Sequence, residues 1–292
     1  MKHQIKERGN KMKKALSVIL SVLMIMSCFV LSVSAEGTET DYLVLGDSIA
    51  YGSGLTNPVE AVYGKIIADT YGFNYKNHSV PGHTTGNLLK RLQNEEVIAA
   101  VKDAEIISIS IGGNNFLMSN LIGLMFDAMV KDDYSEMDRI AEGFYNEFSE
   151  IMDVIRENNP DAVVLMQTLY NPQSGELRKV YGEGQKRLNE MVNKYNEENP
   201  GDIIIVEVGA ALGDDMECFA ADDIHPSAKG NELIAEEIIK TMSDKGIAEY
   251  KDPVITTEGI DFENGFSFPF LDFFVKVFTF LGKIYSFLAN LF

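Results

Sequence analysis

The chain has 292 residues, of which 46% are hydrophobic, so it can bury the core of one domain and still carry appendages at its ends. Its 44 acidic residues outnumber its 25 basic residues and give a net charge of −19 at pH 7. Such a negative field repels phosphate backbones, so we expect no nucleic-acid partner.

Residues 1–35 have the composition of a secretory signal. A basic stretch ends at Lys14, an apolar run covers residues 15–33, and small residues precede a predicted cleavage after Ala35. Because the apolar run is about as long as a membrane span, an uncleaved anchor is the alternative. Met12 is a second candidate start. We therefore expect a secreted, extracellular protein.

Short strands and amphipathic helices alternate along the rest of the chain. Apolar, β-branched runs predict strands at 42–45, 73–77, 106–111, 162–166 and 203–208. Helical patterns lie between or after them at 59–71, 85–93, 134–157, 175–198 and 227–242. This alternation predicts an α/β fold in which helices cover both faces of a parallel sheet. We assign the catalytic domain to residues 41–245.

Two polar side chains stand directly after predicted strands. Ser48, in LGDSIAYG, follows the first strand, and Asn114, in IGGNN, follows the third. Taken singly, each segment is also consistent with a polar turn or a helix cap. Functional groups of parallel sheets gather at the carboxyl ends of the strands, however, so the two side chains could face one crevice.

A serine hydroxyl is a poor nucleophile unless an imidazole accepts its proton and a third group orients that imidazole. The chain has four histidines, and only His225, in DDIHPSAKG, carries an acid at close spacing. Asp222 and Asp223 both qualify by spacing alone. Pro226 restricts His225 to an extended backbone and suits the first position of the following helix, which fixes the imidazole at a helix start.

Taken together, these segments resemble the SGNH hydrolases, the GDSL esterase and lipase family. The family's four blocks correspond to GDS with Ser48, SVPGHTTG with Gly82, GGNN with Asn114, and DDIHP with Asp222 and His225. The resemblance covers about residues 42–242. It implies a three-layer α/β/α sandwich of the flavodoxin type, with a five-stranded parallel sheet.

The resemblance also implies a role for each matched residue. Ser48 would attack an ester carbonyl, His225 would act as general base and then acid, and Asp222, rather than its neighbour, would orient His225. The oxyanion hole would consist of the backbone N–H groups of Ser48 and Gly82 and the side-chain amide of Asn114.

The segment after Asn114 is rich in flexible apolar side chains, among them Leu117, Leu121 and Met125. A core helix is the simpler interpretation. Because such side chains adapt to varied ligands and the segment adjoins the expected oxyanion site, we also consider these three residues as an acyl pocket.

Residues 246–268 are expected to form a linker, and residues 269–292 an apolar amphipathic helix rich in Phe and Leu. Each large apolar side chain contributes roughly 1.5 to 3 kcal/mol when it is buried, so such a surface should find a partner. We expect attachment to a membrane surface, with self-association or packing on the domain as alternatives.

Our leading hypothesis is a secreted serine esterase or lipase that hydrolyses carboxylic esters of small molecules or lipids without a cofactor or metal. One alternative is a carbohydrate esterase that removes acetyl groups from polysaccharide. A second, from another class, is a non-catalytic surface binding module that keeps the fold.

Overall fold

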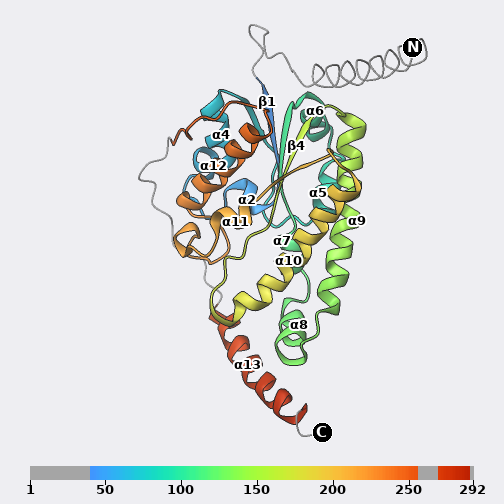
Figure 1. The fold of residues 1–292 in the computed structure, drawn as a ribbon, viewed down its shortest axis with the longest axis vertical. Coiled ribbons are helices and arrows are strands. Elements are labelled where there is room, and N and C mark those ends of the chain that lie inside the picture. The colour runs from blue at the N-terminus through green and yellow to red at the C-terminus, as the bar shows by residue number, and fades with distance from the viewer. Residues whose placement is uncertain (1–39, 256–268, 290–292) are drawn as a thin grey trace, which may run out of the picture. The chain divides into compact units, whose positions relative to one another are not determined.

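The computed structural model describes residues 40–255 and 269–289. Its centre is a sheet of five parallel strands in the order β2-β1-β3-β4-β5 (Figure 1). The strands are β1 (Asp41–Gly46), β2 (Asn74–Asn77), β3 (Ile106–Ser110), β4 (Val163–Gln167) and β5 (Ile204–Val206). Each predicted strand is therefore observed, with small shifts at its ends.

Helices cover both faces of this sheet (Figure 1). One layer contains α5 (Thr85–Arg91), α6 (Glu95–Asp103), α9 (Ser135–Asn158) and α10 (Gly175–Glu198), and the other contains α3 (Pro58–Ala61), α4 (Tyr63–Tyr71), α11 (Val208–Leu212) and α12 (Ala228–Asp244). Side chains along β1 point alternately to the two faces of the sheet, so Leu43 and Leu45 pack with the first helix layer, and Tyr42 and Val44 with the second. The predicted three-layer α/β/α fold is confirmed.

The sheet order sets where a site can form. Strands β1 and β3 are neighbours and end level, since Gly46 pairs with Ser110 and the N–H of Asp47 donates to the Ser110 carbonyl oxygen at 3.1 Å. From β1 the chain crosses to β2 on one side, whereas β3 lies on the other side of β1. The carboxyl ends of β1 and β3 are therefore the point where the strand order reverses. Helix α2 (Ser48–Tyr51) follows β1 here, and α7 (Gly113–Leu117) follows β3.

The prediction of a single helix over 59–71 is wrong, because the structure contains α3 and α4 on either side of Val62. The backbone of Val62 is extended, with φ −69° and ψ 146°. In one continuous helix the N–H of Tyr63 would bond within the helix, but it donates instead to the side-chain oxygen of buried Asn231 on α12, at 3.1 Å. A contact between distant segments therefore interrupts the helical pattern.

A third apolar cluster lies beside the two main layers. It joins α8 (Leu121–Phe126) and the π-helix η1 (Asp127–Lys131) to α13 (Pro269–Ala289), the helix expected in the tail. Phe278 of α13 is buried in this cluster, whereas Phe273, Phe280 and Phe287 are exposed. One face of the tail helix therefore packs on the domain, and another remains uncovered.

Two sequence-based expectations fall on other parts of the chain. The predicted signal segment, residues 1–35, and most of the predicted linker lie outside the described residues. Within the described ranges, none of the helices has both the length and the apolar character that crossing a bilayer requires.

Candidate active site

The candidate nucleophile, Ser48, lies at a sharp turn between β1 and α2. Gly46 adopts a φ of 145°, and a Cβ atom here would lie 2.1 Å from the carbonyl oxygen of Ser110, so only glycine fits. Asp47 caps α2, because its Oδ1 accepts a hydrogen bond of 3.0 Å from the N–H of Ile49. The turn therefore makes the half-buried Ser48 the first helical residue beyond the sheet.

The backbone N–H groups of Ser48 and Gly82 donate to no acceptor among the described residues. Gly82 is the third residue of a turn that a 3.2 Å hydrogen bond closes, from the N–H of His83 to the carbonyl of Val80. With Pro81 at the second position and a φ of 81° at Gly82, this is a type II turn, which favours glycine there. Both N–H groups are thus available to a ligand.

The side-chain amide of Asn114 joins these two turns. Asn114 is buried on α7, and its Nδ2 donates to the carbonyl oxygen of His83 at 3.0 Å. The same nitrogen lies 3.5 Å from Oδ2 of Asp47, a weak contact. Asn114 therefore lies between the residue after Gly82 and the residue before Ser48, which brings the three expected oxyanion donors to one corner of the site.

The acid and base candidates are bonded to each other. Oδ2 of Asp222 lies 2.5 Å from Nδ1 of His225, and Oδ1 accepts from the N–H groups of Ile224 and His225 at 3.0 and 2.9 Å. Asp223 is exposed and turns the chain with a φ of 54°. Of the two acids that spacing left open, Asp222 is therefore the partner of the imidazole. Burial raises the pKa of Asp222, but the hydrogen bonds from His225 and Ile224 and the nearby imidazole together outweigh burial and bring its pKa below the usual value.

His225 lies against the loop that follows Ser48. At Gly54, where φ is 95°, a Cβ atom would lie only 2.9 Å from Cβ of His225. The same loop is tied back to the nucleophile, because the N–H of Ser53 donates to the Ser48 carbonyl oxygen at 2.9 Å. Among the hydrogen bonds between described residues, none joins Ser48 Oγ to His225. In enzymes without bound substrate such bonds are often long and tighten only when substrate binds.

Asp47 is a buried titratable group that the sequence analysis did not single out. Its side chain is 2% exposed, and burial raises its pKa to about 7, although the hydrogen bond from the Ile49 N–H and the nearby His225 oppose that rise. An Asp that precedes the first residue of a helix is a recognisable N-cap, so its position was readable from the sequence. Its burial was not.

Two further side chains, both on the segment after β4, hold the loop that carries the acid and base. The hydroxyl of Tyr170 donates to the carbonyl oxygen of Ile224 at 2.8 Å, and Nε2 of Gln173 donates to that of Asp223 at 2.6 Å. Burial raises the pKa of Tyr170, and the nearby carboxylates of Asp47 and Asp222 raise it further. Neither residue was predicted from the sequence, where its only signal was its place after a strand end.

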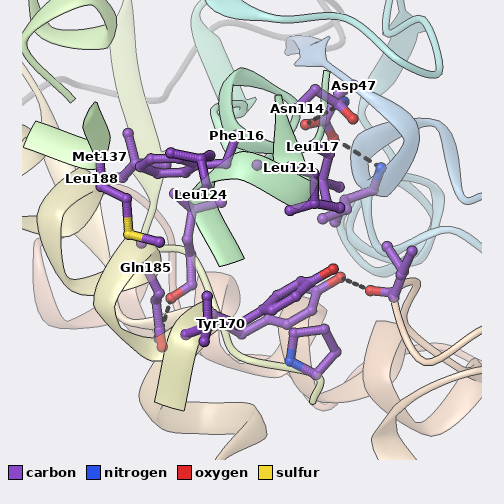
Figure 2. A pocket seen from close by; sticks show the side chains of 18 of the residues that line it. Asp47, Asn114, Phe116, Leu117, Leu121, Leu124, Met137, Tyr170, Gln185 and Leu188 are labelled. Atoms are coloured by element: carbon purple, nitrogen blue, oxygen red, sulfur yellow. Dashed lines mark hydrogen bonds between the residues drawn. The ribbon is translucent and has the colours of Figure 1, made fainter. Parts of the chain in front are cut away.

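A largely apolar pocket opens beside Ser48 and Asn114. Its atom-free space is ≈ 810 Å³ when the open mouth is included. Figure 2 shows Asp47 and Asn114 at one end of this pocket, with Met137 and Leu188 toward the other. The pocket wall is thus mainly apolar, with the polar side chains of Asp47 and Asn114 at one end and that of Gln185 toward the other.

The structure places two of the three residues considered for an acyl pocket in this wall. Leu117 and Leu121 line it, but Met125 does not: it is fully buried in the third apolar cluster. Leu124, one position earlier on α8, lines the pocket instead. Nearly every side chain of this helix is apolar, so the sequence contained no polar face from which its orientation could be determined.

Acidic side chains near the site pair with a cation. Nζ of Lys229 lies 2.7 Å from carboxylate oxygens of both Asp215 and Glu217. Across 40–255 and 269–289, the structure groups no three His, Cys, Asp or Glu side chains as metal ligands. The expectation that the protein needs no metal stays a prediction.

Comparisons with known proteins identify a family and similar proteins. Residues 44–233 match the GDSL-like Lipase/Acylhydrolase family, and this span contains every site residue expected from the sequence. Uncharacterized protein YpmR of Bacillus subtilis (strain 168) is 24% identical over 252 residues, which cover 77% of this chain and 94% of that protein.

Many solved structures share the fold, and two of them serve as examples. The lipase Lip_vut3 from a goat rumen metagenome has a TM-score of 0.56 and 24% identity, over 70% of this chain and 97% of its own. The extracellular lipase of Streptomyces rimosus has a TM-score of 0.57 and 16% identity, over 69% of this chain and 99% of its own. With the family match over most of the domain, the chain belongs to the GDSL-like lipase and acylhydrolase family, and is a hydrolase of the esterase or lipase type.

Proposed function

We propose that the protein hydrolyses carboxylic esters through an acyl-enzyme formed on Ser48. The observation that carries this proposal is the bonded pair of Asp222 and His225, held against the loop that follows Ser48. A paired acid and base near a serine at a strand end is the arrangement that activates a hydroxyl. Family membership supports the reaction class.

The acid fixes which nitrogen of the imidazole acts as base. Because Nδ1 of His225 faces the Asp222 carboxylate at 2.5 Å, the neutral ring keeps its proton on Nδ1 and leaves Nε2 free to accept one. As Ser48 Oγ bonds to the ester carbonyl carbon, its proton moves to Nε2. The imidazolium then gives that proton to the departing alcohol as the ester C–O bond breaks. Water attacks the acyl-enzyme by the same steps and releases the carboxylic acid.

The negative charge of each tetrahedral intermediate would be stabilised by the N–H groups of Ser48 and Gly82 and by Nδ2 of Asn114. The two N–H groups have no acceptor among the described residues, and each is held by the hydrogen bonds of its own segment. Such preorganised donors commonly contribute the largest single share of transition-state stabilisation.

The pocket favours a medium-length acyl chain over acetyl. Its wall beyond Asn114 consists mainly of apolar side chains, including Leu121 and Leu124, and it extends to Met137 and Leu188, so an acetyl group would leave most of it without contact. We expect kcat/KM to rise from p-nitrophenyl acetate to the octanoate. A flat or falling series would favour the alternative, a carbohydrate esterase that removes acetyl groups from polysaccharide.

The non-catalytic binding module makes the opposite prediction about the serine. A fluorophosphonate reacts only with an activated nucleophile, so a binding module would remain unlabelled although it is folded. Labelling of wild type but not of Ser48→Ala would reject this alternative.

We also propose that the protein is secreted and attaches to membrane surfaces through the uncovered side of α13. Phe280 and Phe287 are exposed there, as are Lys276 and Lys283, which anionic lipid headgroups attract. Phe280→Ser with Phe287→Ser should abolish sedimentation with anionic liposomes. Unchanged sedimentation would reject the proposal, and a shift from dimer to monomer would favour self-association instead. Sequencing the amino terminus of the exported protein tests cleavage after Ala35.

A further inference from the structure

The wall of the pocket and the docking site of the tail helix are two sides of the same short element. Leu121 and Leu124 of α8 line the pocket. Leu124 also belongs to the apolar cluster that contains Met125, Ala128 and Phe278, the last of these from α13. Leu124 thus belongs both to the pocket wall and to the cluster that contains the tail helix.

The tail helix packs closely on this element. The Phe278 side chain is 6% exposed, and its ring meets that of Phe126 edge to face with centroids 5.4 Å apart. At Gly282 a Cβ atom would lie 2.5 Å from the carbonyl oxygen of Met129 in η1, so the two backbones approach as only glycine allows. Figure 1 shows α13 next to α8.

The element that α13 covers depends on packing contacts for its position. Helix α8 covers only Leu121–Phe126, and the π-helix η1 continues it. Helices this short are marginal by themselves and depend on packing, and π-turns are frequent at functional sites. On the inner side α8 borders the pocket. Its outer support comes from α13, together with Met137 and Ile140 of α9 and Val180 of α10 in the same cluster.

We infer that α13 is a structural part of the acyl pocket and determines which acyl chain length the enzyme accepts. This inference rests on the proposed ester hydrolysis and adds a role for a helix that lies outside the matched family span. Phe278 acts as a positioning residue, because it reaches the acyl chain only through Leu124 and its neighbours. Loss of the support lets the wall move and weakens contacts to long chains, while acetyl esters, which do not reach the wall, are unaffected.

A matched pair of full-chain variants tests the inference. Phe278→Ala removes the buried contact, and Phe280→Ala removes the same side chain from an exposed position, 63% accessible, on the same helix. In Phe278→Ala the ratio of kcat/KM for octanoyl over acetyl ester should fall about tenfold, the size of effect of a few methylene contacts in an apolar pocket. In Phe280→Ala the ratio should be unchanged.

A second pair of variants keeps the inference testable if Phe278→Ala unfolds the tail helix. Gly282→Ala adds one methyl group where Met129 blocks it, whereas Gly143→Ala adds the same group on α9, where no atom lies within 4 Å. Alanine favours a helix at both sites, so intrinsic propensity cannot explain a difference. Only Gly282→Ala should lower the octanoyl-to-acetyl ratio.

Binding of octanoate, measured by calorimetry, separates this inference from the proposed reaction. If wild type hydrolyses no ester but binds octanoate, and Phe278→Ala weakens that binding about tenfold, the reaction is wrong and the role of α13 stands. An unchanged ratio and an unchanged octanoate affinity in both Phe278→Ala and Gly282→Ala overturn the inference. So does an equal loss in Phe280→Ala.

Discussion

Replacing Asp222 by Asn tests the proposed acid and base with little change of shape. Asn keeps an oxygen that can accept the two backbone N–H groups that Oδ1 now holds, so the loop should stay folded. Toward Nδ1 of His225, however, it presents an NH₂ group in place of the carboxylate oxygen at 2.5 Å. The ring must then accept at Nδ1 and carry its proton on Nε2. In that tautomer it cannot take a proton from Ser48.

The size of the effect follows from this change. In a serine hydrolase the wrong tautomer lowers kcat by about ten-thousand-fold, which corresponds to about 5.5 kcal/mol of lost transition-state stabilisation. A weakened but correctly oriented base would cost far less, because general-base catalysis as a whole contributes about a hundred- to ten-thousand-fold.

The assay is kcat on a soluble p-nitrophenyl ester, with a thermal melt of each variant as the control for folding. Asp223→Asn is the matched variant: Asp223 is exposed, and Asn tolerates its left-handed φ of 54°, so activity should stay within about twofold of wild type. If Asp222→Asn kept more than a tenth of wild-type turnover, or if Asp223→Asn lost as much, the assignment of the acid would be wrong.

Three more predictions follow from single contacts. Asn114→Ala should lower kcat about a hundred- to a thousand-fold on the ester panel, and Tm should fall by about 2 to 4 °C because the His83 carbonyl loses its donor; a loss of kcat below tenfold would remove Asn114 from the oxyanion hole. Tyr170→Phe leaves the Ile224 carbonyl without its donor, so Tm should fall by about 2 to 4 °C and kcat with it, whereas an unchanged Tm would contradict this support. Asp47 has a raised folded pKa of about 7 against 3.8, so its proton stabilises the fold fully below pH 3.8 and not above 7. As pH rises from 4 to 8, the free energy of unfolding of Asp47→Asn, measured in guanidinium, should therefore rise relative to that of wild type by on the order of 4 kcal/mol. Parallel pH curves of the two proteins would refute the raised pKa of Asp47.

The sheet and its site edge could be predicted because they depend on local patterns. Buried parallel strands appear in the sequence as continuous β-branched runs, and a polar residue after such a run lies at the sheet's functional edge. Ser48 and Asn114 follow β1 and β3, which are neighbours in the sheet. Helix α6 was missed although Asn94 caps it through its side chain, a signal that the sequence contained.

What could not be predicted depends on contacts between distant segments. The side-chain oxygen of Asn231 accepts the N–H of Tyr63 and interrupts the helical pattern at Val62, and no sequence pattern near Val62 indicates this contact. Whether Asp222 or Asp223 meets the imidazole depends on one left-handed residue in the loop. The role of Tyr170 depends on a hydrogen bond across 54 positions in the chain.

The orientation of apolar helices was equally hidden. Leu124 and Met125 differ by one position, yet one lines the pocket and the other is fully buried. For α13 the sequence predicted an apolar amphipathic helix but could not state which face the domain would cover, because large apolar side chains occupy most of its circumference. Phe278 and Phe280 are chemically identical, and only the folded chain distinguishes them.

The central claim is that Ser48 is an activated nucleophile. The most direct test incubates the full chain with a fluorophosphonate at pH 7.5 and locates the adduct by peptide mass spectrometry. We predict one adduct per chain, on Ser48, lost in Ser48→Ala and slowed at least about a thousand-fold in His225→Ala. A folded wild-type protein that stays unlabelled, or that carries the adduct on another serine, would contradict the account.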